Sequence, residues 1–209
     1  MSDRLREQAS TTGGVTRRGA LKALGAGAGG FALWPYLSTE GAHAFALIQQ
    51  SQAPPRLRFL TPAQYKDVDA LAEAIIPADE RSPGARAARV ADYIDLLLSE
   101  SDEETQTTWT DGLAEVNRVS QERFHAPFAR LPASQTAELL TEMSRSERKP
   151  QSQLEKFFKT TKDATVRGYY TSEIGIHKEL QYKGNQYLPE FVGCKTVDGE
   201  PCPHCGQEP

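Results

Sequence analysis

The side chains best suited to chemistry are the cysteines at the end of the chain. All three fall in the last sixteen residues, as Cys194, Cys202 and Cys205, and His204 precedes the last of them. Two cysteines separated by two residues, with a histidine between them and a third cysteine upstream, could supply the ligands of a zinc site. Cys-x-x-Cys is also typical of thiol-redox proteins, and in an oxidising compartment cysteines form disulfides by default.

The surroundings of these cysteines favour a disulfide. Adjacent His204 and Cys205 are poorly placed to bind one ion, and a thioredoxin-like motif needs a βαβ setting that the sequence lacks. We therefore regard Cys194, Cys202 and Cys205 as disulfide candidates. A metal site, thiol-redox chemistry and unpaired thiols remain as alternatives.

No catalytic motif stands out elsewhere in the sequence. It contains no Gly-x-Ser-x-Gly, no phosphate-binding loop and no His-Glu-x-x-His. Gly25–Gly30 fits Gly-x-Gly-x-x-Gly, but a basic segment rather than a strand precedes it, so we do not interpret it as a nucleotide site. We predict no catalytic residue, no metal and no cofactor in this chain.

Two adjacent arginines mark the N-terminal region. The stretch from Thr16 to Lys22 reads Thr-Arg-Arg-Gly-Ala-Leu-Lys, and an uncharged apolar run over residues 23–34 follows it. This layout resembles the signal of the twin-arginine (Tat) export route, with Ala20 where phenylalanine is usual. The matching residues include Arg17, Arg18, Leu21 and Lys22. The resemblance predicts binding to the Tat translocase and a periplasmic location; the alternative is an arginine pair in a basic tail.

The apolar run suits a removable signal better than a membrane span, which takes ~20 apolar residues. Gly41-Ala42-His43-Ala44 offers small residues at an Ala-x-Ala spacing. We expect a signal peptide over residues 1–44, cleavage between Ala44 and Phe45, and no stable membrane span afterwards. An uncleaved signal would leave a weak membrane tether.

Composition and periodicity predict one all-α domain. The net charge of −4 argues against nucleic acid as a partner, and no segment alternates as a strand does. We expect a linker over residues 45–58, where glutamine, serine and proline offer little to bury. A single-domain antiparallel bundle of about five helices should follow within residues 59–194. Its last part, after Tyr170, should be irregular, and a Cys-containing flexible tail should occupy residues 195–209.

Local signals place the ends of the helices. Thr61-Pro62-Ala63-Gln64 predicts a capping box with proline in the first turn, and the stretch from Ser101 to Glu104 predicts a second capping box. The expected helices run from Pro62 to Ile76, from Ala87 to Leu98, from the second capping box to about Arg123, around Leu139 to Met143, and onward from Gln153.

Several short stretches carry a resemblance through their order along the chain. They are Phe59-Leu60-Thr61-Pro62, Ala74-Ile75-Ile76-Pro77, Pro83-Gly84-Ala85, Asp92-Tyr93-Ile94-Asp95, Phe157-Phe158, the run from Gly168 to Gly175, and the run from Leu180 to Asn185. This pattern resembles the gluconate 2-dehydrogenase subunit 3 family, the small subunits of periplasmic flavin-dependent sugar and polyol dehydrogenases. The similarity spans roughly Leu57 to Cys194.

The resemblance implies an accessory role. In such complexes a large flavoprotein subunit holds FAD and oxidises the sugar, and a cytochrome c subunit often takes the electrons. The small subunit supplies the export signal and supports folding or assembly of the flavoprotein. The alternatives are a small periplasmic metal-binding or thiol-redox protein that uses the C-terminal cysteines, and a free-standing helical binding domain.

Aromatic and apolar residues near the C-terminal end of the domain suggest a partner surface. Large side chains of this kind form the centres of protein interfaces. The candidates for partner binding are Tyr169, Tyr170, Ile174, Tyr182 and Tyr187. The alternative is that these side chains close the end of the bundle itself.

Overall fold

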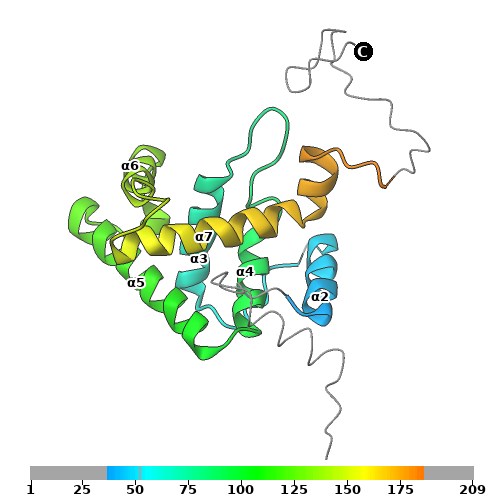
Figure 1. Cartoon of the computed structure of the whole chain (residues 1–209), viewed down its shortest axis with the longest axis horizontal. Coiled ribbons are helices and arrows are strands. Elements are labelled where there is room, and N and C mark those ends of the chain that lie inside the picture. Colours follow the sequence, from blue (N-terminus) through cyan, green and yellow to red (C-terminus); the bar gives the residue numbers. More distant parts are fainter. Residues whose placement is uncertain (1–36, 52, 186–209) are drawn as a thin grey trace, which may run out of the picture.

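The computed structural model describes residues 37–51 and 53–185, and this part of the chain is built from helices and the turns that join them (Figure 1). The α-helices are α2 (Thr39–Gln50), α3 (Pro62–Ile75), α4 (Val90–Ser99), α5 (Glu103–Phe124), α6 (Ala133–Met143) and α7 (Gln153–Tyr170). Phe128–Arg130 forms a 3-10 turn, η1, and Gly175–Glu179 forms a π-helical turn, η2. The prediction of an all-α domain is confirmed.

Helix α4 lies at the centre of the core. Each residue from 90 to 98 is buried, and α2, α3 and α7 all pack against this helix. Its sequence, Val-Ala-Asp-Tyr-Ile-Asp-Leu-Leu-Leu-Ser, is apolar on nearly every side, as expected for a helix that neighbours surround. The two aspartates within it therefore need partners, because buried carboxylates without hydrogen bonds are costly.

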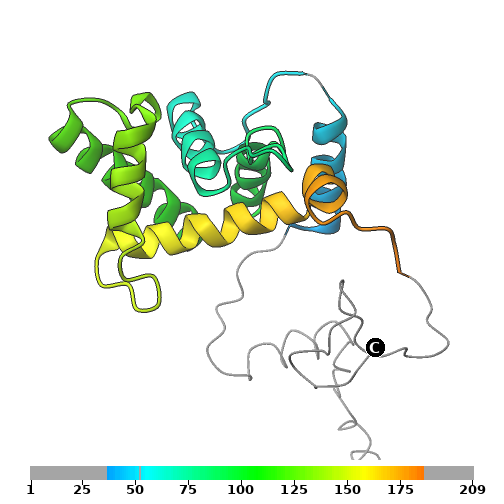
Figure 2. The ribbon, with the colours of Figure 1, turned by 90° about the horizontal axis from the view of Figure 1, so that it is seen from above.

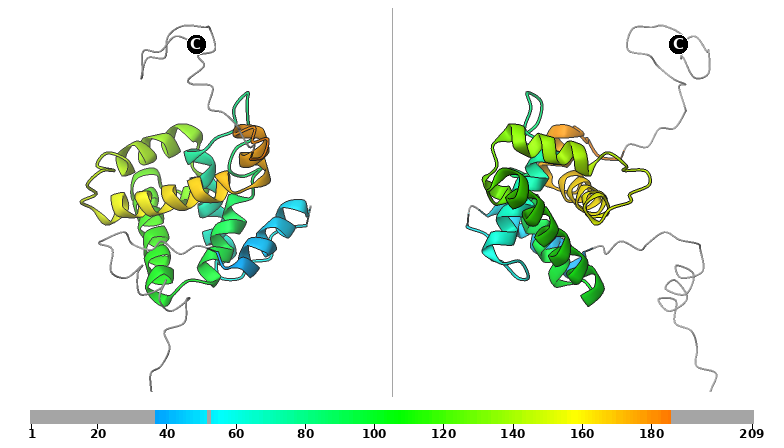
Figure 3. Two further views of the ribbon diagram at one scale, coloured as in Figure 1. Left: turned by 45° about the vertical axis from the view of Figure 1, so that its right-hand side comes forward. Right: turned by 90° about the vertical axis from the view of Figure 1, so that its left-hand side faces the viewer.

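Helix α7 crosses α3 and α4 and also contacts α5 and α6 (Figures 1 and 3). Glycines allow the closest approaches at these crossings. A Cβ on Gly112 of α5 would overlap the ring of Phe157, and one on Gly168 of α7 would press on the ring of Tyr93. Phe157 also meets Trp109 edge to face, with ring centroids 5.4 Å apart.

The helix caps agree with most of the local signals. Thr61 and Gln64 form the predicted capping box of α3, with Pro62 in its first turn. Ser152 and Glu155 form another at the start of α7. The capping box predicted at Ser101 is wrong by one residue: Asp102 is the N-cap of α5, and its side chain accepts a hydrogen bond from Thr105 N at 2.8 Å.

Three predicted boundaries need correction. Residues 45–50 are not a linker but the second half of α2, because Phe45 is buried and Ser38 caps the helix. Helix α4 begins at Val90 rather than Ala87, because Arg89 adopts a left-handed backbone with φ of 56°. The segment after Tyr170 is irregular only in part, since η2 adds a helical turn.

Candidate functional site

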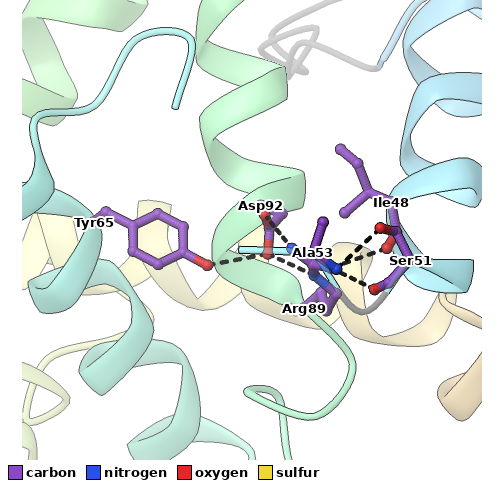
Figure 4. A network of polar contacts seen from close by, with 6 residues as sticks. All are labelled: Ile48, Ser51, Ala53, Tyr65, Arg89 and Asp92. Carbon is purple, nitrogen blue, oxygen red and sulfur yellow. Dashed lines mark hydrogen bonds and ion pairs between the residues drawn. The ribbon is translucent and has the colours of Figure 1, made fainter. Parts of the chain in front are cut away.

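Arg89 is the centre of a polar network that joins three helices (Figure 4). Its Nε and Nη2 atoms donate to the carboxylate of Asp92 at 3.0 and 3.1 Å. Its Nη1 atom donates to the carbonyl oxygens of Ile48 and Ser51, at 3.0 and 2.8 Å, at the C-terminal end of α2. The hydroxyl of Tyr65, on α3, donates to Oδ2 of Asp92 at 3.0 Å.

The network is largely sheltered from water. The side chains of Arg89 and Asp92 are 18% and 6% exposed. Burial, followed by the charge of Asp92 and the hydrogen bond to it, raises the pKa of Tyr65, so that this hydroxyl stays protonated and remains a donor. The positive guanidinium also faces the carbonyl oxygens that end α2, where the helix dipole favours a cation. Arg89 therefore links the C-terminal end of α2 to the start of α4 and, through Asp92, to Tyr65 of α3.

Asp95 holds the segment that leads into α3. Its carboxylate accepts hydrogen bonds from the backbone N–H groups of Arg58, Phe59 and Leu60, at 2.7, 3.1 and 2.7 Å. The residue is only 3% exposed. Asp92 and Asp95 lie one helical turn apart on α4, so one face of this helix fixes both α2 and the residues before α3.

A third buried carboxylate, that of Asp67, positions η1. It accepts hydrogen bonds from Asn117 Nδ2 at 2.6 Å and from Ala129 N at 3.1 Å. Asn117 in turn accepts from Phe128 N at 3.0 Å. Burial raises the pKa of Asp67, while these two donors oppose the shift.

The buried carboxylates of Asp67, Asp92 and Asp95 all accept hydrogen bonds from other segments of the chain. Their arrangement suits a structural role, in which they hold those segments in place. Sequence reasoning did not assign a role to any of them. The signal that could have found Asp92 and Asp95 is their place in an otherwise apolar helix, because a buried carboxylate almost always has partners. Nothing in the sequence identifies which backbone groups those partners are.

The predicted partner-binding residues do not share one environment. Tyr169 is 2% exposed, and its hydroxyl donates to the carbonyl oxygen of Pro83 at 2.8 Å and shares a 2.6 Å hydrogen bond with Ser82. Burial raises its pKa. Tyr169 thus secures the loop between α3 and α4 and is not available on the surface in this chain. Ile174 is partly buried against the core.

The remaining described candidates, Tyr170 and Tyr182, are among the large hydrophobic side chains that are exposed on segments near one end of the domain. The large exposed hydrophobic side chains of the described residues are Leu47, Val166, Tyr170, Leu180 and Tyr182, which we call the apolar end surface. They come from α2, the last turns of α7, and the residues that follow η2. Figure 2 shows α2 and η2 side by side at this end, where Gln49 Oε1 accepts a hydrogen bond from Glu173 N at 2.7 Å. Leu47 and Val166 were not predicted.

Other predicted sites fall outside the described residues or inside α2. The signal residues Arg17, Arg18, Leu21 and Lys22, the candidate Tyr187, and Cys194, Cys202 and Cys205 all lie outside residues 37–51 and 53–185. The predicted cleavage bond between Ala44 and Phe45 lies within α2.

None of the helices in the described part of the chain combines the length and apolar character needed to cross a bilayer. Within the same residues, no group of three or more His, Cys, Asp and Glu side chains is arranged to hold a metal ion.

Comparison with known proteins identifies the family. The family model for gluconate 2-dehydrogenase subunit 3 matches residues 62–189, which are more than half of the chain and include every helix from α3 to η2. Searches of curated proteins and of solved structures find no match. The chain belongs to the gluconate 2-dehydrogenase subunit 3 family.

Proposed function

We propose that this chain is the non-catalytic small subunit of a periplasmic, FAD-dependent sugar or polyol dehydrogenase complex. The observation that carries the proposal is the family match over residues 62–189, since the family is named for a subunit of gluconate 2-dehydrogenase. FAD belongs to the large subunit in this proposal, and a cytochrome c subunit is a further candidate partner.

Export is the second part of the proposal. Arg17 and Arg18, with Leu21, Lys22 and the apolar run after them, resemble a Tat signal. The Tat route carries folded proteins, so a large subunit without a signal could travel bound to this chain. The Tat translocase would then be a transient partner, and the assembled complex would be periplasmic.

The apolar end surface is the proposed contact with the flavoprotein. Aromatic side chains are enriched at the centres of interfaces, where a few residues supply most of the binding free energy. Tyr182 is 50% exposed and Leu180 is 58% exposed, and both follow η2. Val166 and Tyr170 lie one turn apart on α7, so this helix can present both side chains from a rigid support.

Removal of the gene for this chain tests both parts. Dehydrogenase activity and FAD-containing protein should fall in the periplasm and return with the wild-type chain. With a chain that carries Arg17→Lys and Arg18→Lys, the dehydrogenase activity and the FAD-containing protein should stay in the cytoplasm. The control chain, with Arg4→Lys and Arg6→Lys, should restore their export. Normal periplasmic activity without the chain would contradict the proposal. Normal export of the twin-lysine chain would contradict the Tat assignment alone.

A further inference from the structure

Helix α2 is an integral part of the folded domain. Residues 41, 44, 45 and 48 recur at the spacing of one helical face and are buried or partly buried. Phe45 is 4% exposed and meets Tyr93 of α4 edge to face, with ring centroids 5.2 Å apart. A residue with this burial belongs to the core rather than to a detachable leader.

Both ends of α2 are held by other segments. At the N-terminal end, the backbone N and the hydroxyl of Ser38 donate to the carboxylate of Glu100 at 2.8 and 3.0 Å. At the C-terminal end, Arg89 binds the carbonyl oxygens of Ile48 and Ser51. Gln49 also accepts a hydrogen bond from Glu173 N, beside η2.

The backbone of Arg89 is held in one defined conformation. Its φ of 56° and ψ of 38° lie in the left-handed region, which non-glycine residues rarely adopt. Such a conformation persists only where the surrounding contacts determine it. Here the turn before α4 closes around Arg89, with hydrogen bonds from Arg89 N to Arg86 O at 3.0 Å and from Val90 N to Ala85 O at 3.1 Å. From this turn the side chain reaches Asp92 and the two carbonyl oxygens of α2.

We propose that the exported chain retains α2, because the folded domain protects the Ala44–Phe45 bond from proteolysis. A protease needs local opening to reach a bond inside a packed helix. Cleavage there would separate Ser38 from Phe45, and would create a charged ammonium group on a residue whose side chain is buried. The sequence signal for cleavage at Ala44 is therefore overridden by the fold.

Limited proteolysis of the purified full chain with chymotrypsin tests the protection. The cuts to be measured follow Phe45 and Leu47, with the products identified by mass. The wild-type chain should be cut slowly at both bonds. Arg89→Ala with Glu100→Ala removes contacts at both ends of α2 without altering the cleaved sequence, so these cuts should become about tenfold faster or more. Arg118→Ala, which removes ion pairs within α5, is the matched control and should behave as the wild type.

The outcomes separate this inference from the proposed function. Equal cutting of the wild-type chain and the double variant after Phe45 would show that α2 is not held, and would overturn the inference. An N-terminus at Phe45 in chain recovered from the periplasm would also overturn it. An N-terminus at or before Leu37 supports the inference. A chain that keeps α2 but brings no flavoprotein would contradict the proposed function alone.

Discussion

The guanidinium Nη1 of Arg89 lies 3.0 Å from the carbonyl oxygen of Ile48, although 41 residues separate them in the chain. With the hydrogen bond to the carbonyl oxygen of Ser51, this contact joins the end of α2 to the start of α4, the helix around which the core is built. The same side chain pairs with Asp92, which also accepts from Tyr65 of α3. The relative positions of α2, α3 and α4 therefore depend on the guanidinium of Arg89.

Replacement of Arg89 by alanine should lower the free energy of unfolding by about 2–4 kcal/mol, because it leaves the buried carboxylate of Asp92 without its counter-ion. Relief of the left-handed backbone offsets none of this, since alanine is no better suited to it than arginine. Urea unfolding of the full chain gives the measurement. Arg118→Ala, in an exposed ion pair, should cost no more than about 1 kcal/mol. Equal losses in the two variants would contradict the assigned role of Arg89.

Gly112→Ala should destabilise the crossing of α5 and α7. Its new Cβ would overlap the ring of Phe157, which already packs edge to face on Trp109. Overpacking of this kind costs about 1–3 kcal/mol, against a smaller gain in helix propensity. Thermal unfolding should show a clearly lower midpoint, whereas Asp111→Ala on the exposed side of the same helix should change it little. A raised midpoint for Gly112→Ala would mean that the two helices can separate without cost.

A helix can be predicted from the sequence when its cap and its apolar face are both encoded by residues close together in the chain. The capping box of Thr61 and Gln64 and the apolar stripes of α3 to α7 suffice because they involve neighbours within a few residues. Helix α2 has the same face periodicity at residues 41, 44, 45 and 48, but the small residues there also fit a cleavage site. The cleavage signal ended the predicted signal peptide at Ala44, and the glutamine, serine and proline of residues 45–58 led to the linker prediction.

The environment of the site residues required the three-dimensional structure. Tyr169 and Tyr170 are neighbours with the same side chain, yet one is 2% exposed and the other 38% exposed. Their place in the packing depends on the loop containing Ser82 and Pro83, about 86 residues earlier in the chain. No local pattern encodes such a pairing, nor the left-handed backbone of Arg89.

The stability of the domain should depend on pH through Asp67. Burial raises its folded-state pKa above the ordinary value of 3.8, so the folded state holds a proton to higher pH than the unfolded state does. The stabilisation from this group is complete below about pH 3.8 and is lost as pH rises through the folded pKa. The free energy of unfolding of the wild type, minus that of Asp67→Asn, should therefore fall as pH rises across that window.

Asp102 supplies the opposite control for this pH series. Its pKa is lowered by hydrogen bonds from Thr105, so its stabilisation is present above the unfolded pKa and is lost as pH falls through the folded pKa. The free energy of unfolding of the wild type, minus that of Asp102→Asn, should therefore rise with pH. Parallel slopes for the two aspartates would contradict the burial assigned to Asp67.

Leu180→Ala with Tyr182→Ala should weaken the binding of the flavoprotein while leaving the isolated chain stable. Both side chains are at least half exposed, and exposed substitutions usually change stability by no more than about 0.5 kcal/mol. Loss of an interface anchor can cost about 2 kcal/mol or more of binding. Thermal unfolding of the isolated chain and co-purification of the flavoprotein are the two readouts.

Tyr169→Phe is the matched control for the surface variant. It removes the hydroxyl that bonds Ser82 and Pro83, so it should lower the midpoint of thermal unfolding while the folded fraction still binds the flavoprotein. If instead the surface pair lowers the midpoint by several degrees and binding by the folded chain is normal, the apolar end surface belongs to the core of this chain.

The most direct test of the account is isolation of the chain, at native expression, from the periplasm. Size-exclusion chromatography, mass spectrometry and visible absorption would identify what accompanies it. We predict that it elutes with a larger protein, and that the shared peak is yellow and releases FAD on denaturation. Elution of the chain alone, with the flavin in another fraction or absent, would contradict its assignment as a subunit of a flavin-dependent dehydrogenase.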